Sequence, residues 1–337
     1  MSSWAHIALI VVLAGVIYLA SEWFVNAIEW LGVELKVGTM AVGTVLAAIG
    51  TALPESVVTL AAVLFSGGAS GDEIGVGAAL GGPLVLATIA YAAIGLLMVT
   101  RARRLRFVGD SFAEVPQERL RMDQRWFFCI ASAALLLGLL VFPVKWVIGF
   151  GFLAVYGLYL RRELSGSDQA HTSEDLEGLR IWRSDSTPKR WAIIAQVVGS
   201  LVVVIVASQL FVGQLEWAGP AVGLAPAVVA LLVAPIATEL PELMNAIIWV
   251  RQGKTSLALA NVSGSMMVQA TIPAALGLFF TPWHFSPPLI AASLATLGAI
   301  AYQLIVMRGK RFTPAWLMGT ALFYVAFAVF LITGNAT

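Results

Sequence analysis

The nonapeptide Ala234-Pro-Ile-Ala-Thr-Glu-Leu-Pro-Glu242 lies inside an apolar run that extends from Pro220 to Val250. Two carboxylates three residues apart are unexpected there, because an ionisable group at membrane depth is costly unless it faces a polar cavity. Pro235 and Pro241 also remove backbone donors and interrupt the helix. A broken helix is tolerated at membrane depth only where it is buried in protein or lines a water-filled site. The stretch therefore predicts a polar site inside a membrane protein.

The core of this motif occurs a second time. Gly50-Thr-Ala-Leu-Pro-Glu55 repeats the Thr-x-Leu-Pro-Glu pattern, again deep in an apolar run. Each copy lies near the middle of a run, 37–65 or 220–250, that is too long for one straight crossing of the bilayer. We therefore predict a tilted or discontinuous helix at both places.

The composition agrees with a membrane protein. The 337 residues are 59% hydrophobic and only 12% charged, whereas a soluble domain has about 25% charged residues. The single cysteine, Cys129, excludes an internal disulfide framework and shows no metal-ligand spacing. No basic region precedes the first apolar run, so we expect an uncleaved first span and no signal peptide. The fold class predicted from these features is an all-α polytopic membrane protein.

Apolar runs of about 20 residues mark the expected spans. Ten are predicted, near 4–21, 37–65, 74–99, 126–142, 144–160, 191–213, 220–250, 255–280, 286–307 and 313–333. Ten crossings divide the 20 Lys and Arg residues nineteen against one, with Lys145 alone on one side. This asymmetry is the positive-inside pattern. It predicts a protein of the inner (plasma) membrane with both termini on the outer side.

A polar stretch near 161–190 divides the ten spans five and five. We predict a first repeat over 1–161, a solvated cytoplasmic linker over 162–190, and a second repeat over 191–337. Because five is odd, the second half enters the membrane from the opposite side, so the repeats are inverted. Inverted five-helix repeats with broken helices that meet at the midplane are typical of secondary transporters.

The acidic residues indicate where an ion would bind. Of 19 Asp and Glu residues, only Glu55, Glu239 and Glu242 lie well inside predicted spans. An inverted repeat places Glu55 and Glu242 across a pseudo-twofold axis, where both can hold one cation. Thr51 and Thr238, four residues before each motif glutamate, can add hydroxyl or carbonyl oxygens. Such oxygens are the ligands that hard cations such as Ca²⁺ and Na⁺ prefer.

A second polar pattern follows the motif in the second half. Asn261, Ser265 and Gln269 recur every four residues and form one stripe along the span 255–280. The stripe predicts side chains that line the cation site, with simple hydrogen bonding between helices as the alternative. For the glutamates, the alternative is a pair of Pro-kinked helices whose acids are capped by neighbouring Ser and Thr.

The motifs resemble the sodium/calcium exchanger family of the cation/Ca²⁺ antiporter superfamily. The likeness rests on Thr-x-Leu-Pro-Glu followed by an Asn-x-x-Gly-Ser helix, over about 37–99 and 220–280. The resemblance implies alternating-access exchange of Ca²⁺ against Na⁺ or H⁺, no enzymatic activity, and no cofactor apart from the transported cations. It further implies that Glu55 and Glu242 are the central ligands, with supporting oxygens from Thr51, Thr238 and Ser265.

The sequence also departs from the family pattern. Positions with polar side chains in the family hold Ala52, Ala78, Gly82-Pro83 and Leu86 in the first half, and Glu239, Met266 and Gln269 in the second. The first half has thus lost most auxiliary oxygens, and the second half has gained a carboxylate. We expect a divergent member whose ion, counter-ion or stoichiometry differs, including exchange of another cation against H⁺.

Other classes of function are less well supported. The three histidines lie at span ends or in the linker and no His-Glu-x-x-His motif exists, which argues against an intramembrane metalloenzyme. A non-transporting cation-binding receptor or scaffold stays open, because the first half lacks ligands. The expected partners are inorganic cations and the lipid bilayer, with no nucleic acid; the pattern predicts no particular oligomeric state.

Overall fold

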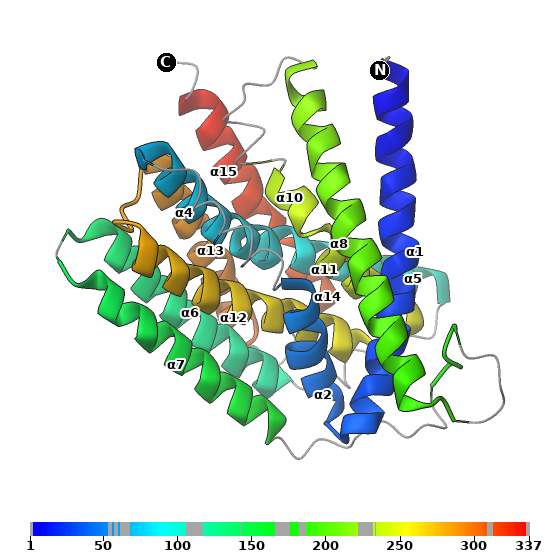
Figure 1. The fold of residues 1–337 in the computed structure, drawn as a ribbon. Helices are drawn as coiled ribbons and strands as arrows, with labels where there is room; N and C mark the ends of the chain where they lie inside the picture. The colour runs from blue at the N-terminus through cyan, green and yellow to red at the C-terminus, as the bar shows by residue number, and fades with distance from the viewer. Residues whose placement is uncertain are drawn as a thin grey trace.

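The structure is a computed structural model, and every regular element it describes is a helix (Figure 1). The described residues are 3–52, 56, 60, 68–105, 117–141, 143–165, 176–181, 187–221, 232, 234–308 and 313–334. The prediction of an all-α protein is confirmed within this part of the chain.

The helices before the linker are α1 (Ser3–Leu35), α2 (Thr39–Ala41), the π-helical η1 (Val42–Ala47), α4 (Gly68–Val85), the π-helical η2 (Leu86–Ala90), α5 (Tyr91–Leu105), α6 (Gln117–Leu139) and α7 (Lys145–Leu164). Those after it are α8 (Arg190–Ala221), α10 (Ala234–Thr238), α11 (Leu240–Gln252), α12 (Thr255–Phe280), α13 (Pro287–Val306), α14 (Pro314–Met318) and α15 (Ala321–Gly334).

Several of these helices are long and apolar enough to cross a membrane. Within the described residues there are six: Ala5–Leu35, Ala79–Thr100, Arg190–Phe211, Thr255–Phe280, Pro287–Val306 and Pro314–Thr333. Each overlaps one of the ten predicted spans. Large apolar side chains cover the outer faces of neighbouring helices as well, with Leu136 of α6 59% exposed and Phe150 of α7 58% exposed. Apolar surface on this scale suits contact with lipid.

Helix α1 continues beyond its predicted end at residue 21. The reason is that its polar residues find partners on other helices. Glu29 is 3% exposed. It accepts a hydrogen bond of 2.7 Å from the Trp249 indole and forms an ion pair with Lys254. A buried acid with such partners no longer ends an apolar helix.

The predicted helix break in the second half lies at Glu239. Helix α10 ends at Thr238 and α11 begins at Leu240, while Glu239 between them has φ −84° and ψ 5°. Pro241 occupies the first turn of α11, where a missing N–H removes no helical bond. In the first half, helix is described from Thr39 to Ala52, and Leu53–Glu55 lie outside the described residues.

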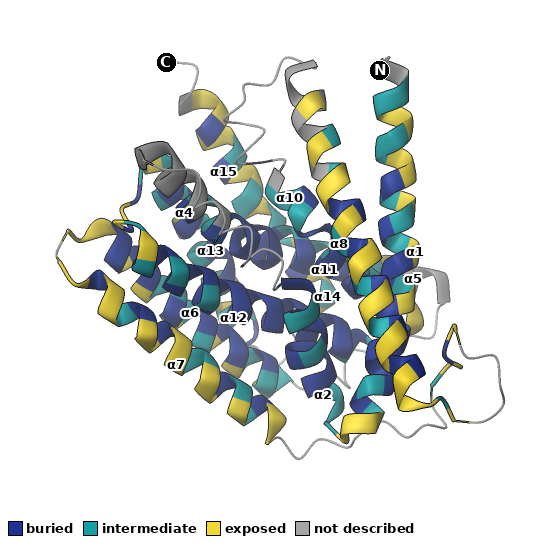
Figure 2. Ribbon diagram, in the orientation of Figure 1, coloured by how far each residue is buried: buried dark blue, intermediate teal, exposed yellow. Residues whose placement is uncertain are grey.

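Helix α12 lies at the centre of the fold and is buried along almost its whole length (Figure 2). It packs against η1, α4, α6, α7 and α11. Gly264 allows the closest of these approaches, because a Cβ there would overlap the backbone of Thr44 in η1. The predicted polar stripe of α12 therefore faces protein and not lipid.

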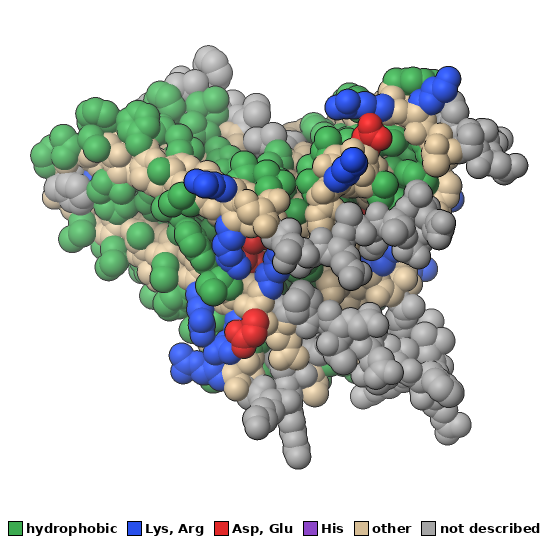
Figure 3. Space-filling model, turned by 90° about the horizontal axis from the view of Figure 1, so that it is seen from below, with side chains coloured by type: hydrophobic (Ala, Val, Ile, Leu, Met, Phe, Trp, Pro, Cys, Tyr) green, Lys and Arg blue, Asp and Glu red, His purple; other side chains and the backbone are tan. Residues whose placement is uncertain are grey.

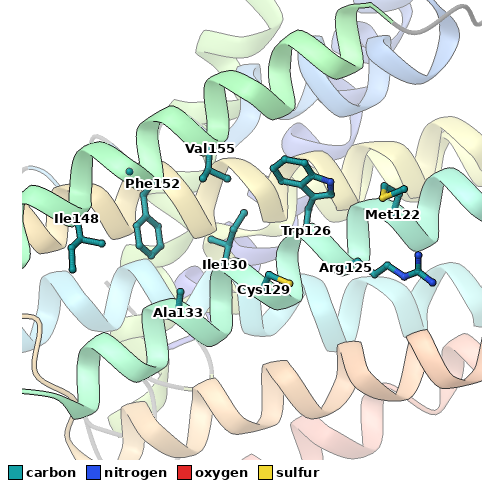
Figure 4. Close-up of a pocket in the computed structure, with 10 residues that line it drawn as sticks. Met122, Arg125, Trp126, Cys129, Ile130, Ala133, Ile148, Phe152 and Val155 are labelled. Atoms are coloured by element: carbon teal, nitrogen blue, oxygen red, sulfur yellow. The ribbon is translucent and has the colours of Figure 1, made fainter.

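Helices α6 and α7 form an outer pair beside α12 (Figure 1). A groove of about 590 Å³ runs between them, and Figure 4 shows Cys129 and Ile130 of α6 beside Phe152 and Val155 of α7 along it. Its lining is almost entirely apolar, so we interpret it as a surface for hydrocarbon chains and not as an ion site.

One segment of the predicted linker, residues 176–181, is anchored to the helices, although four of its six residues are exposed, as expected for a solvated segment. Residues 176–181 lie against α1 and α8, where the Trp30 indole donates to the Glu177 carbonyl at 2.9 Å and Gln196 accepts from the Ile181 backbone at 3.0 Å. Leu179 is 2% exposed. Burial of this one leucine and satisfied backbone groups fix the segment.

Basic side chains gather on the face shown in Figure 3. Viewed from below, Lys and Arg side chains gather with few Asp and Glu (Figure 3). Lys145, the single basic residue predicted for the other side, is 7% exposed and donates to the carbonyls of Pro282 and Trp283 at 3.2 and 3.0 Å.

Candidate functional site

The break between α10 and α11 brings the second-half motif against α12. Glu239 and Glu242 are both fully buried, at 0% exposure. Thr238 ends α10, where its hydroxyl donates to the Pro235 carbonyl at 3.1 Å. The lone pairs of that hydroxyl stay available to a cation, since only its proton is used.

Glu239 is bound by the last residue of the polar stripe. The amide nitrogen Nε2 of Gln269 donates to both Glu239 oxygens, at 2.9 and 3.0 Å. Gly82 of α4 adjoins this pair, and a Cβ there would come within 2.9 Å of Gln269 Cδ and 2.5 Å of Glu239 Oε1. Position 82 in the first half holds a polar side chain in the family but a glycine in this chain. The second half places the Glu239 carboxylate beside it.

Glu242 differs from Glu239 because no side-chain amide of the described chain donates to its carboxyl oxygens. Neither of its carboxyl oxygens accepts a hydrogen bond of good geometry from any residue the structure describes. Thr51 of the first half, 3% exposed, lies beside this carboxyl and donates its own proton to the Ala47 carbonyl at 3.1 Å. Asn261 Nδ2 approaches the Glu242 backbone carbonyl at 3.4 Å. A buried carboxyl without donors must be neutralised by a cation or a proton.

The same region is rich in other buried oxygens. Within the described chain, the side-chain oxygens without a hydrogen-bond partner include Asn261 Oδ1, Ser265 Oγ and Gln269 Oε1. All three belong to the stripe along α12 and are at most 2% exposed. Buried polar groups are nearly always paired, so a concentration of free acceptors indicates a ligand. Oxygen acceptors select a hard cation.

One member of the predicted site lies outside the described residues. Glu55 belongs to the segment that is not described, so its pairing with Glu242 stays a prediction. Among the described residues, no group of three or more His, Cys, Asp or Glu side chains is gathered as a metal site. The structure does bring together Glu239, Gln269 and the first-half helix α4, and it places Thr51 beside Glu242.

Asn245 was missed by the sequence analysis. It lies one turn after Glu242 on α11 and is 0% exposed. Neither its oxygen nor its nitrogen has a hydrogen-bond partner in the described part of the chain. The three-residue spacing from Glu242 is a signal that could have identified it, because such residues share a helix face.

Known proteins are similar to this chain in sequence and in fold. An uncharacterised membrane protein of Methanocaldococcus jannaschii is 22% identical over 316 residues, which cover 93% of each chain. The sodium-calcium exchanger NCX_Mj, in a structure with Na⁺ and zero Ca²⁺, is 18% identical, with TM-score 0.69 over 95% of this chain and 97% of its own. The same exchanger with neither ion gives TM-score 0.68 at 17% identity, over 98% of this chain and 100% of its own.

The family comparison covers most of the molecule. Residues 5–162 and 192–333 match the family described as sodium/calcium exchanger protein. The two segments include both Thr-x-Leu-Pro-Glu motifs and far more than half of the 337 residues. Proteins of this family are cation antiporters of membranes, in agreement with the apolar helices and the buried acids. The chain belongs to the sodium/calcium exchanger protein family.

Proposed function

We propose that the protein is a secondary active antiporter that exchanges Ca²⁺ against Na⁺ or H⁺ at a site of buried carboxylates. The observation that carries the proposal is Glu242, a fully buried carboxyl beside Thr51, whose two oxygens accept no hydrogen bond of good geometry from the described residues. A bound cation supplies the charge that this position lacks. The relative NCX_Mj is a sodium-calcium exchanger, which supports the same pair of ions.

The proposed architecture is two inverted repeats of five helices, over 1–161 and 191–337, joined by the linker 162–190. Its support is that the family match divides into 5–162 and 192–333 and omits the intervening residues. Both termini lie outside an inner (plasma) membrane in this proposal. The nineteen-to-one division of Lys and Arg supports that orientation.

The proposed ligands fall into two groups. Glu242 and Glu55 hold the transported cation, with oxygens from Thr51 and Thr238. Side chains of α12 and α11 complete the coordination, because Ca²⁺ binds six to eight oxygen ligands. These further ligands are Asn261, Ser265, Gln269, Glu239 and, from the structure, Asn245.

The two second-half glutamates have different roles in this proposal. Gln269 donates two hydrogen bonds to Glu239, so the protein itself stabilises part of that charge. Glu242 lacks comparable donors in the described residues and is left to the ion. Glu239 then adds negative charge near the cation, and the hydrogen bonds from Gln269 orient its carboxylate.

Exchange follows from the cost of burying charge. An ion-free site carries up to three negative charges, from Glu55, Glu239 and Glu242, and cannot be occluded from water without a large penalty. Binding of Ca²⁺ or of its counter-ion neutralises the site and permits the halves to rock. Because both ions need the same carboxylates, each is carried only after the other leaves.

The test is uptake of radioactive Ca²⁺ by vesicles that contain the purified protein. We expect uptake driven by an outward Na⁺ or H⁺ gradient, and its loss in Glu242→Gln. The matched control is Glu118→Gln, which changes an acid that is 84% exposed and pairs only at the surface with Arg121. Wild-type uptake that neither gradient drives would overturn the proposal.

A second candidate is a cation-binding receptor or scaffold without transport. Gly82 favours it, because a first-half ligand position carries no side chain. Thermal stabilisation by Ca²⁺ measures binding independently of flux. Stabilisation that Glu242→Gln removes, together with absence of uptake, would establish the receptor in place of the antiporter.

A further inference from the structure

A second cluster of buried charges lies apart from the candidate ion site. Asp123 in the first turns of α6 and Glu163 in the last turn of α7 are 1% and 2% exposed. Both lie outside the apolar spans predicted at 126–142 and 144–160, on the side that the proposed orientation makes cytoplasmic. Two buried acids at adjacent helix ends need an explanation, because neither is used by the proposed ion site.

Glu163 has the hydrogen bonds of a carboxylate. Its Oε2 accepts from Arg119 Nη2 at 2.8 Å and from the Thr44 hydroxyl at 3.0 Å. The Thr44 hydroxyl also lies 3.0 Å from the Met40 carbonyl oxygen. A hydroxyl has one proton, so Thr44 can donate to Glu163 or to Met40 but not to both at once.

Asp123 lacks such partners. Neither of its oxygens accepts a hydrogen bond of good geometry from a described residue, and Glu163 Oε1 and the Tyr159 hydroxyl are also without one there. Arg162 lies between the two acids, with Nη1 3.5 Å from Asp123 Oδ1 and 4.0 Å from Glu163 Oε1. Its side chain is 34% exposed, which connects the cluster to water.

The surroundings favour a neutral Asp123. Burial and, second, the negative charge of Glu163 raise the pKa of Asp123 to about 8, although Arg162 and Arg119 oppose the shift. The titratable and charged groups that face Asp123 are Arg119 of its own helix, Tyr159, Arg162 and Glu163 of α7, and Tyr91 of α5.

Two chains of contacts lead from this cluster to α12. Thr44 belongs to η1, and the helix continues beyond η1 to Ala52 and so includes Thr51. The backbone of Thr44 lies against Gly264. On the other side, Gln124 donates to the Tyr91 hydroxyl, which lies 2.8 Å from Ser263 Oγ. Helix α7 also packs directly on η1. Contacts therefore connect Asp123 with the helices that carry the proposed ion ligands.

We propose that Asp123 is a proton-binding site, distinct from the ion site, through which cytoplasmic pH regulates transport by way of Glu163 and Thr44. The proposal rests on the proposed antiport. When Asp123 is protonated, Arg162 is free to pair with Glu163, whose Oε1 lies 4.0 Å from its Nη1, so Thr44 is free to donate to Met40 and η1 can move. Loss of the proton draws Arg162 to Asp123. Glu163 then depends on Arg119 and Thr44, and η1 is held against α7.

The first experiment follows the proton itself. Infrared difference spectra of the purified protein record the C=O stretch of a protonated buried carboxylic acid as the pH is raised. We expect a band that disappears with a midpoint near pH 8 and is absent from Asp123→Asn. Its absence from the wild type, or its presence in the variant, would overturn the site whether or not the protein transports ions.

The second experiment tests the coupling. With equal pH on both sides of the vesicle, Ca²⁺ uptake of the wild type should fall several-fold as the pH rises through about 8. Asp123→Asn, whose side chain is uncharged like the protonated acid, should stay at the higher rate. Thr44→Val should keep the infrared titration but lose this step, while Thr44→Ser should restore it.

The outcomes separate two kinds of failure. Uptake with the same pH dependence in the wild type and Asp123→Asn overturns the regulatory site and leaves the antiporter intact. No uptake by the wild type at any pH overturns the antiporter and, with it, the regulation of transport. In that case the infrared titration still decides whether Asp123 binds a proton.

Discussion

Gly82→Ala tests the contact between the two halves at the candidate ion site. The added Cβ would lie 2.9 Å from Gln269 Cδ and 2.5 Å from Glu239 Oε1, closer than unbonded atoms approach. Glu239 and Gln269 are 0% and 2% exposed, so neither can move away into water. The clash must therefore displace the amide that donates twice to Glu239.

The cost can be estimated from general values. Overpacking a buried site costs about 1–3 kcal/mol, and weakening hydrogen bonds to a charged group adds about 1.5–3 kcal/mol for each one lost. Alanine in a helix interior returns about 0.5–1 kcal/mol relative to glycine. We expect Gly82→Ala to destabilise the protein by roughly 2–5 kcal/mol, taking the overpacking cost with one bond lost and the helix gain subtracted.

The matched control is Gly77→Ala in the same helix. A Cβ at Gly77 would meet only Leu289, at 3.8 Å, an ordinary contact. This change should be neutral or slightly stabilising. The assay is the apparent unfolding temperature in detergent, with and without Ca²⁺. Equal temperatures for the two variants would refute the placement of Glu239 and Gln269 against α4.

Three further predictions concern other parts of the structure. Lys145→Met should destabilise the protein by about 1–3 kcal/mol, because the carbonyls of Pro282 and Trp283 lose a buried donor; an unchanged unfolding temperature would exclude these bonds. Cys129, the single cysteine, is exposed in the groove between α6 and α7. In vesicles it should react with an apolar maleimide and resist a charged one; equal labelling by both would show that the groove faces water. For Asp123, the folded-state pKa of about 8 lies above its ordinary value of 3.8, so the folded state binds more protons between these values and stability falls as pH rises. The unfolding temperature of the wild type should therefore fall relative to that of Asp123→Asn from about pH 4 to pH 8, and parallel curves would count against a buried neutral acid.

The departures from the family pattern have a physical basis in the fold. Glu239 replaces a small polar residue, Gln269 replaces an acid or amide, and Gly82 replaces a serine; the structure places all three together. The glycine leaves room for the larger carboxylate, and the glutamine donates to it. A carboxyl group supplied by the second half thus lies where the first half has lost an oxygen.

The sequence by itself determined the class of the molecule and predicted the core of its candidate site. Apolar runs of membrane length, two carboxylates in a Pro-broken run and the polar stripe along 255–280 are local patterns, and local patterns predict helices, burial and breaks. The family membership and the break at Glu239 agree with that analysis. The burial of Glu29 could not be predicted in this way, because its partners are more than 200 residues away in the sequence.

Only the tertiary structure decided which polar groups meet. The choice of Gln269 as the donor to Glu239, the free amide of Asn245 and the cluster around Asp123 all depend on how α4, α6, α7 and α11 pack around α12. A hydrogen bond exists only when two atoms lie within about 3.5 Å in the correct geometry. Sequence spacing fixes that distance within one helix but not between helices, so contacts between helices had to come from the folded chain.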